Sequence, residues 1–150
     1  MRRWMWAAAL LAAVPAVAEE PLVQVFASET CGCCDLWVEH MAAAGFRLRV
    51  ETVPDLDTLY GMKDLAGVPP AAASCHTAIV DGYLVEGHVP AAEVRRLLAE
   101  RPDAAGIAVP GMPQGSPGMP AAVAERYDVI VFGGGATERF ATYVGEQRVD

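Results

Sequence analysis

The stretch Leu22-Val-Gln-Val-Phe-Ala-Ser-Glu-Thr-Cys-Gly-Cys-Cys34 contains the features on which the fold prediction depends. Residues 22–26 alternate well enough for a half-buried strand, and Ser28 to Thr30 supply residues that favour a helix start. The next apolar residues fall on one stripe at helical spacing and stop at Gly45. These residues are Leu36, Trp37, His40, Met41 and Ala44. The cysteines are therefore predicted to lie at a strand-to-helix turn.

The chain continues with further strand and helix patterns. We predict strands at 46–53, 77–80 and 83–86, and helices at 55–65 and 90–100. Asp81-Gly82 between the two later strands favours a type I′ hairpin turn. This order, with cysteines after the first strand and a proline before the hairpin, is that of an α/β, thioredoxin-like, three-layer fold.

The C-terminal third departs from this pattern. Residues 104–124 are rich in Gly and Pro and have no periodicity, which predicts a surface loop carrying Met112 and Met119. Residues 127–132 and 137–143, separated by three glycines, predict a C-terminal hairpin. We expect residues 19–150 to form a single metal-binding domain.

Residues 1–18 have the features of a secretory signal peptide. Two arginines precede an apolar run at 4–17, and Ala16-Val-Ala18 is a small-residue cleavage site. An uncleaved anchor is the less favoured alternative because the run is short and contains a proline. We therefore expect a periplasmic protein with no stable membrane anchor after cleavage.

The charge of the chain excludes nucleic acid as a partner. Residues 1–18 contain two arginines and no acidic residue, so their removal changes the formal net charge from −8 to −10. The simplest meaning of this acidity is a solvated surface.

The four cysteines form two clusters, Cys31, Cys33 and Cys34 in one tetrapeptide and Cys75 directly before His76. Two structural disulfides are disfavoured, because pairs among adjacent cysteines are strained and a Cys31–Cys34 bond leaves the other two to find each other. The start of a helix stabilises thiolates. In a thioredoxin-like fold, the loop before the third strand faces this turn, so the two clusters are expected to meet.

Four thiolates and an imidazole suit either tetrahedral Zn²⁺ or Cu⁺ ions, several of which thiolates can bridge. The thioethers of Met112 and Met119 favour Cu⁺ over Zn²⁺, although both side chains could instead only attach the loop to the core. Cys75 could also be a small buried residue, and His76 a hydrogen-bonded residue at a strand edge. We predict a structural role for His40 and an exposed or capping position for His88, with metal ligation as the alternative for each.

A thiol-disulfide oxidoreductase is the main alternative. It would use Cys31 as nucleophile and Cys34 as resolving thiol, with Val68-Pro69 as the candidate cis peptide bond beside them. A third possibility is an interaction module stabilised by disulfides.

Seven segments of the chain form a recognisable set: Thr30-Cys-Gly-Cys-Cys34, Trp37-Val-Glu-His40, Gly67-Val-Pro-Pro70, Ala73-Ser-Cys-His-Thr77, Val80-Asp-Gly-Tyr83, Glu86-Gly-His-Val-Pro90 and Val109-Pro-Gly-Met-Pro113. Together they resemble the CopG-like family of exported bacterial copper-resistance proteins. The likeness covers nearly the whole chain after the predicted signal peptide.

The resemblance implies a thioredoxin-like fold, a periplasmic setting and copper bound by the four cysteines. It implies copper ions, and other periplasmic copper-handling proteins, as partners. It says less about His76, Met112 and Met119. Whether the chain catalyses a redox reaction stays open at this point.

Overall fold

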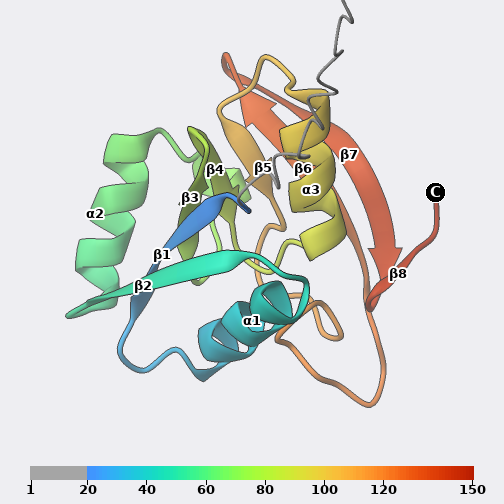
Figure 1. The fold of residues 1–150 in the computed structure, drawn as a ribbon, viewed down its shortest axis with the longest axis horizontal. Coiled ribbons are helices and arrows are strands. Elements are labelled where there is room, and N and C mark those ends of the chain that lie inside the picture. Colours follow the sequence, from blue (N-terminus) through green and yellow to red (C-terminus); the bar gives the residue numbers. More distant parts are fainter. Residues whose placement is uncertain (1–19) are drawn as a thin grey trace, which may run out of the picture.

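The computed structural model describes residues 20–150, and the predicted signal peptide lies outside this range. The protein is a mixed α/β structure with one eight-stranded sheet and three α-helices (Figure 1). The strands are β1 (Leu22–Ser28), β2 (Arg47–Val53), β3 (Thr77–Val80), β4 (Tyr83–Glu86), β5 (Gly106–Ala108), β6 (Arg126–Gly133), β7 (Ala136–Val144) and β8 (Gln147–Arg148). The helices are α1 (Gly32–Ala43), α2 (Leu56–Ala66), α3 (Ala91–Glu100) and one 3₁₀ turn, η1 (Pro70–Ala72).

The sheet has the strand order β2-β1-β3-β4-β5-β6-β7-β8. β1 is parallel to β2 and antiparallel to β3, and β3 and β4 form the predicted hairpin. Asp81 and Gly82 between them have φ angles of 48° and 85°, as a type I′ turn requires at both central positions. The local turn chemistry therefore fixes the register of the hairpin that leads into the site described below.

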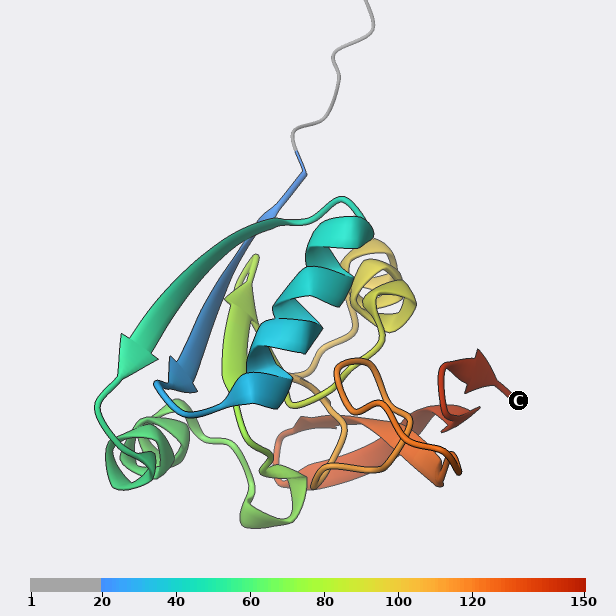
Figure 2. The same cartoon turned by 90° about the horizontal axis from the view of Figure 1, so that it is seen from below.

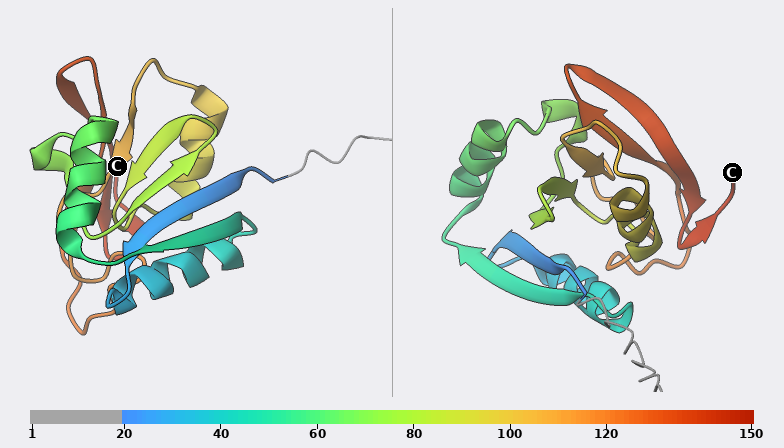
Figure 3. Two further views of the ribbon diagram at one scale, coloured as in Figure 1. Left: turned by 90° about the vertical axis from the view of Figure 1, so that its left-hand side faces the viewer. Right: turned by 45° about the horizontal axis from the view of Figure 1, so that its top comes forward.

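Helices cover both faces of the sheet near β1 (Figures 2 and 3). Val25 on one face is fully buried and belongs to one core cluster with Trp37 of α1 and Leu97 of α3. On the other face, Phe26 and Leu59 of α2 line a common small cavity. Alternate residues of β1 thus point to opposite helical layers, which is the side-chain period of a strand.

The prediction of a surface loop over residues 104–124 is wrong for the first part of this range. Gly106–Ala108 form β5, which pairs in parallel with β4 and antiparallel with β6. This short, fully buried strand joins the C-terminal hairpin to the rest of the sheet. Three residues are too few for a periodic signal, so the strand escaped the sequence prediction.

Among residues 20–150, no helix is long and apolar enough to cross a membrane.

Candidate metal centre

The first cysteine cluster lies where β1 passes into α1. The Cys31 amide donates to the Ser28 carbonyl at 3.1 Å, and the Cys34 amide donates to the Cys31 carbonyl at 3.1 Å as the helix begins. The predicted strand-to-helix turn is therefore present. It places the cysteines in the first turn of α1, where unpaired backbone N–H groups stabilise anions.

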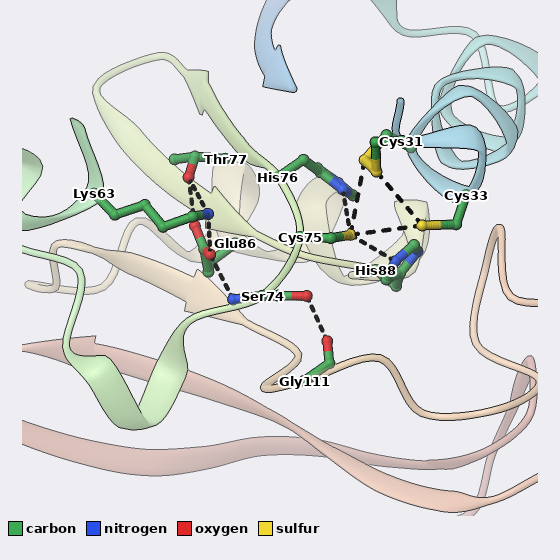
Figure 4. Close-up of polar contacts among 11 residues, drawn as sticks. Cys31, Cys33, Lys63, Ser74, Cys75, His76, Thr77, Glu86, His88 and Gly111 are labelled. Atoms are coloured by element: carbon green, nitrogen blue, oxygen red, sulfur yellow. Dashed lines mark hydrogen bonds and ion pairs between the residues drawn. A yellow bond between two sulfur atoms is a disulfide. The ribbon is translucent and has the colours of Figure 1, made fainter. Parts of the chain in front are cut away.

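The second cluster meets the first, as the sequence predicted. Cys75 comes from the loop before β3, and its Sγ lies 3.9 Å from Cys33 Sγ and 3.7 Å from Cys34 Sγ. Cys33 Sγ is also 3.5 Å from Cys31 Sγ. The four sulfur atoms all lie within 4.8 Å of one another. Figure 4 shows Cys33 and Cys75 pointing toward each other from these separate segments.

Two of the four sulfurs are joined covalently in this structure. Cys31 and Cys34 form a disulfide, and Cys33 and Cys75 are free thiols. The C-x-x-C pair thus closes, while the second bridge that would complete two disulfides is not formed. Cys34 is 1 % exposed, whereas Cys31 and Cys33 are partly exposed at the surface.

Cys75 is held as a neutral thiol. Burial, and after it the neighbouring Cys33, raises the pKa of Cys75 to about 12. A metal ion that binds this sulfur must therefore displace its proton, which couples metal binding to proton release.

His88 corrects a sequence prediction. It is fully buried rather than exposed or capping. Its Nε2 lies 3.0 Å from Cys75 Sγ, and its Nδ1 lies 2.8 Å from the Pro117 carbonyl. The reason is the hairpin register: Thr77 pairs with Glu86, so continuing the ladder outward brings residues 75 and 88 opposite each other.

His76 is also fully buried, with Nδ1 3.3 Å from Cys75 Sγ. Burial lowers the pKa of His76 well below its usual value, and His88 and Lys63 lower it further. Burial likewise lowers the pKa of His88. Both rings are therefore neutral near pH 7, the form in which imidazole binds metal ions.

His40 has the predicted structural role. Its Nε2 accepts a hydrogen bond from the Ala91 amide at 3.1 Å, which ties α1 to the start of α3. His40 is not part of either potential metal-binding group found in the described range.

The two loop methionines occupy different places. Met112 is 51 % exposed and lines a pocket of about 380 Å³ together with Cys31, Cys33 and Cys75. Met119 does not line this pocket. The structure therefore places one thioether of the two at the mouth of the thiol site.

The Gly/Pro-rich segment that carries both methionines is packed tightly on α1. A Cβ atom at Gly118 would lie 2.7 Å from the Cys33 carbonyl oxygen and 2.7 Å from the Trp37 amide nitrogen. Such distances leave no room for a side chain, so the approach of the segment to α1 requires glycine. The neighbouring Pro117 carbonyl is the group that holds His88.

A buried ion pair supports the loop that carries Cys75. Lys63 Nζ of α2 lies 2.5 Å from Glu86 Oε1 of β4, and both side chains are at most 2 % exposed. Glu86 also accepts hydrogen bonds from the Ser74 amide at 2.7 Å and the Thr77 hydroxyl at 2.6 Å. Ser74 and Thr77 flank Cys75 and His76. The ion pair between Lys63 and Glu86 therefore fixes the backbone on both sides of these two potential ligands (Figure 4).

Burial has the largest effect on the pKa of Glu86. Burial raises the pKa of the Glu86 carboxyl, and the Lys63 ammonium partly offsets this effect. Sequence reasoning did not single out either residue, because nothing local indicates that an α2 lysine meets a β4 glutamate.

The peptide bond between Val68 and Pro69 is not cis, because no residue in the range 20–150 has a cis peptide bond. The prediction of a cis bond there is wrong. The residues that face the cysteine turn are those directly before β3, six positions further along the chain.

The solved structures that this chain resembles are those of a copper resistance protein. A family model described as a protein of unknown function, DUF411, matches residues 72–119. No curated protein matches the chain. A solved structure titled "Copper resistance protein copG- Form 2" is 40% identical, with a TM-score of 0.76, over 83% of this chain and 99% of that chain. The Form 1 structure gives the same identity and TM-score over 85% of this chain and 100% of that chain.

Proposed function

This chain belongs to the CopG-like family of copper resistance proteins, and on that premise we propose that it binds Cu⁺ through cysteine thiolates for copper resistance or homeostasis. One observation carries the proposal: the sulfur atoms of Cys31, Cys33, Cys34 and Cys75 lie within 4.8 Å of one another. Soft thiolates at this spacing hold one Cu⁺ or bridge several, and they favour Cu⁺ over harder cations. Zinc is the less favoured metal for this thiolate set.

Copper loading at all four thiolates requires an open Cys31–Cys34 pair. A dithiol reductant supplies the two electrons and two protons that convert the disulfide to two thiols and is itself oxidised to a disulfide, and metal binding then releases the thiol protons. We assign His76 and Met112 as auxiliary ligands, because one faces Cys75 and the other lines the pocket. Met119, predicted in the same role from the sequence, has weaker support.

The proposal also includes the fold around this site and its location in the cell. A thioredoxin-like fold of residues 19–150 is supported by the arrangement of β1 to β4, with β1 parallel to β2 and antiparallel to β3. Periplasmic location and removal of residues 1–18 are supported by the signal-peptide pattern. Other periplasmic copper-handling proteins are the proposed partners.

Elemental analysis tests the proposal directly. We expect protein purified anaerobically from the periplasm of copper-fed cells to carry copper and little zinc. After copper removal under acid and denaturant, we expect thiol counting to find four thiols per chain. Recovery of protein that holds only zinc although all four cysteines are reduced would contradict copper binding.

The disulfide favours thiol-disulfide exchange as a second candidate function. Cys31 is the more exposed sulfur of the pair and Cys34 is buried, which suits an attacking and a resolving thiol. Metal-free recovery of the protein from copper-fed cells, with the Cys31–Cys34 bond closed, would favour this reading over copper storage.

Replacing Met112 with leucine separates ligation from packing. We expect the reduced variant to lose copper faster than the parent to a competing Cu⁺ chelator, because the thioether at the pocket mouth is gone. The fold should tolerate this near-isosteric change with a loss of about 1 kcal/mol or less. Met119→Leu is the matched control, since Met119 lies in the same segment but does not line the pocket. Equal copper retention by parent and both variants would make Met112 a packing residue.

A further inference from the structure

A second group of potential ligands shares Cys75 with the thiolate cluster. Ligand atoms of Cys75, His76 and His88 all lie within 4.8 Å of one another. None of these three residues takes part in the Cys31–Cys34 disulfide. Oxidation therefore removes two sulfurs from the thiolate set and leaves this inner group complete.

The orientation of His88 is fixed by its second hydrogen bond. A carbonyl oxygen only accepts, so the Pro117 carbonyl at 2.8 Å places the ring proton on Nδ1. The lone pair of the neutral ring is then on Nε2, which faces Cys75 Sγ at 3.0 Å. Metal-binding histidines commonly have this arrangement, in which a backbone carbonyl accepts a hydrogen bond from the ring nitrogen that does not bind the ion.

In the described part of the chain, the nitrogens of His76 make no hydrogen bond of normal geometry to any group outside the proposed ligands. Its Nε2 is buried and has no hydrogen-bond partner of normal geometry. Its Nδ1 faces Cys75 Sγ at 3.3 Å, and its ring packs against Trp37 with centroids 4.4 Å apart. An unpaired polar atom in a core is unfavourable, and Nδ1, which faces Cys75, is the nitrogen positioned to bind an ion.

The spacing and the donor types indicate which ion fits. In a tetrahedral zinc site, sulfur and nitrogen ligands are about 3.5 Å apart. The two sulfur–nitrogen distances here, 3.0 and 3.3 Å, require only a slight outward shift. One thiolate with two imidazoles is a borderline donor set, which suits divalent ions such as Zn²⁺ better than Cu⁺.

We propose that the protein with a closed Cys31–Cys34 disulfide binds one borderline divalent cation of the Zn²⁺ class at Cys75, His76 and His88. Cys75 loses its proton to solvent when the ion binds, and a water molecule from the adjoining pocket completes the coordination. Because Cys75 belongs to both groups, the state of the disulfide selects the metal: Cu⁺ at the thiolates when open, a divalent ion at the inner group when closed. The inner site stands without the proposed Cu⁺ binding, whereas the selection between the two metals rests on it.

Equilibrium dialysis of the oxidised protein against Zn²⁺ tests the site, after thiol counting has confirmed two free thiols per chain. We expect one bound Zn²⁺ per chain. His88→Gln should weaken binding by about tenfold or more, in the range found when groups at a metal site are lost. His40→Gln is the matched control, because His40 is a partly buried histidine outside the group, and it should bind like the parent. Absence of Zn²⁺ uptake by the oxidised parent, or equal uptake by His88→Gln, would overturn the proposal.

Alkylation of the parent gives a second readout that needs no variant. Cys75 is a neutral thiol that reacts slowly even without metal, so the readout is Cys33, which should react with a thiol reagent equally with and without Zn²⁺, as read by peptide mass spectrometry. Protection of Cys33 by Zn²⁺ would assign the ion to the two free thiols instead, and would overturn the inner site. Both assays use oxidised protein and Zn²⁺, so their failure is distinct from failure to bind Cu⁺ in reduced protein.

Discussion

Replacing Cys75 with serine is expected to remove most of the tightly bound copper from the reduced protein. Cys75 is the one cysteine outside the cluster at the start of α1, and its Sγ lies within 4 Å of Cys33 and Cys34 sulfurs, at 3.9 and 3.7 Å. If the four thiolates form one shared site, the loss of the Cys75 thiolate must also weaken copper binding at the cysteine turn, although Cys75 is 41 residues from Cys34 in the sequence. We expect at least a tenfold fall in affinity, or about 1.4 kcal/mol, measured anaerobically against a Cu⁺ chelator.

Serine keeps nearly the volume of cysteine, so the fold of this variant should be intact. Ser28→Ala is a suitable control, because Ser28 lines the same pocket but offers no sulfur. Copper stoichiometry and affinity that match the parent in Cys75→Ser would show that the two cysteine clusters act separately.

The largest loss of stability is expected for Glu86→Ala. This change leaves the Lys63 ammonium, 2 % exposed, without its carboxylate, and removes the acceptor of the Ser74 amide. An uncompensated buried charge destabilises a protein by about 3–5 kcal/mol. Urea denaturation of the metal-free protein measures the free energy of unfolding. The same variant should bind copper less well, since the loop before β3 loses its anchor.

A surface ion pair of this chain provides the matched comparison. Arg96 and Glu100 are 2.7 Å apart on α3, but their side chains are 30% and 51% exposed. Glu100→Ala should therefore change the free energy of unfolding by about 1 kcal/mol or less. The double change Lys63→Met with Glu86→Leu should recover much of the loss, because it removes both buried charges together. A Glu86→Ala variant as stable as Glu100→Ala would mean that Lys63 reaches solvent or another partner.

Local sequence patterns predicted most of the fold because most of its elements are specified locally. Asp81-Gly82 predicts the hairpin through its positive φ angles, and the spacing of Trp37 and Met41 predicts the buried face of α1. β5 was missed because three residues carry no period. The strand is specified instead by its two neighbours in the sheet.

The meeting of the two cysteine clusters was predicted from the position of a loop in the expected fold, whereas the buried contacts of His88, Lys63 and Glu86 were missed. Cys75 and His76 were predicted to face the cysteine turn from the position of their loop. His88 was misassigned, although the same hairpin register that was predicted correctly places it opposite Cys75. Lys63 and Glu86 meet only after α2 packs on the sheet, so no local pattern indicates their pairing.

The packing of Trp37 gives the molecule an internal fluorophore. It is the one tryptophan between residues 20 and 150, and its indole is completely shielded from water. Its Nε1 donates to the Val89 carbonyl at 2.9 Å, which holds the ring rigidly beside the His76 imidazole. A redox-active copper ion at the neighbouring sulfur and imidazole groups would shorten the excited state of this indole, whereas redox-inert Zn²⁺ would not. Emission from Trp37 can therefore follow copper occupancy of the centre in real time, without a dye or an added label.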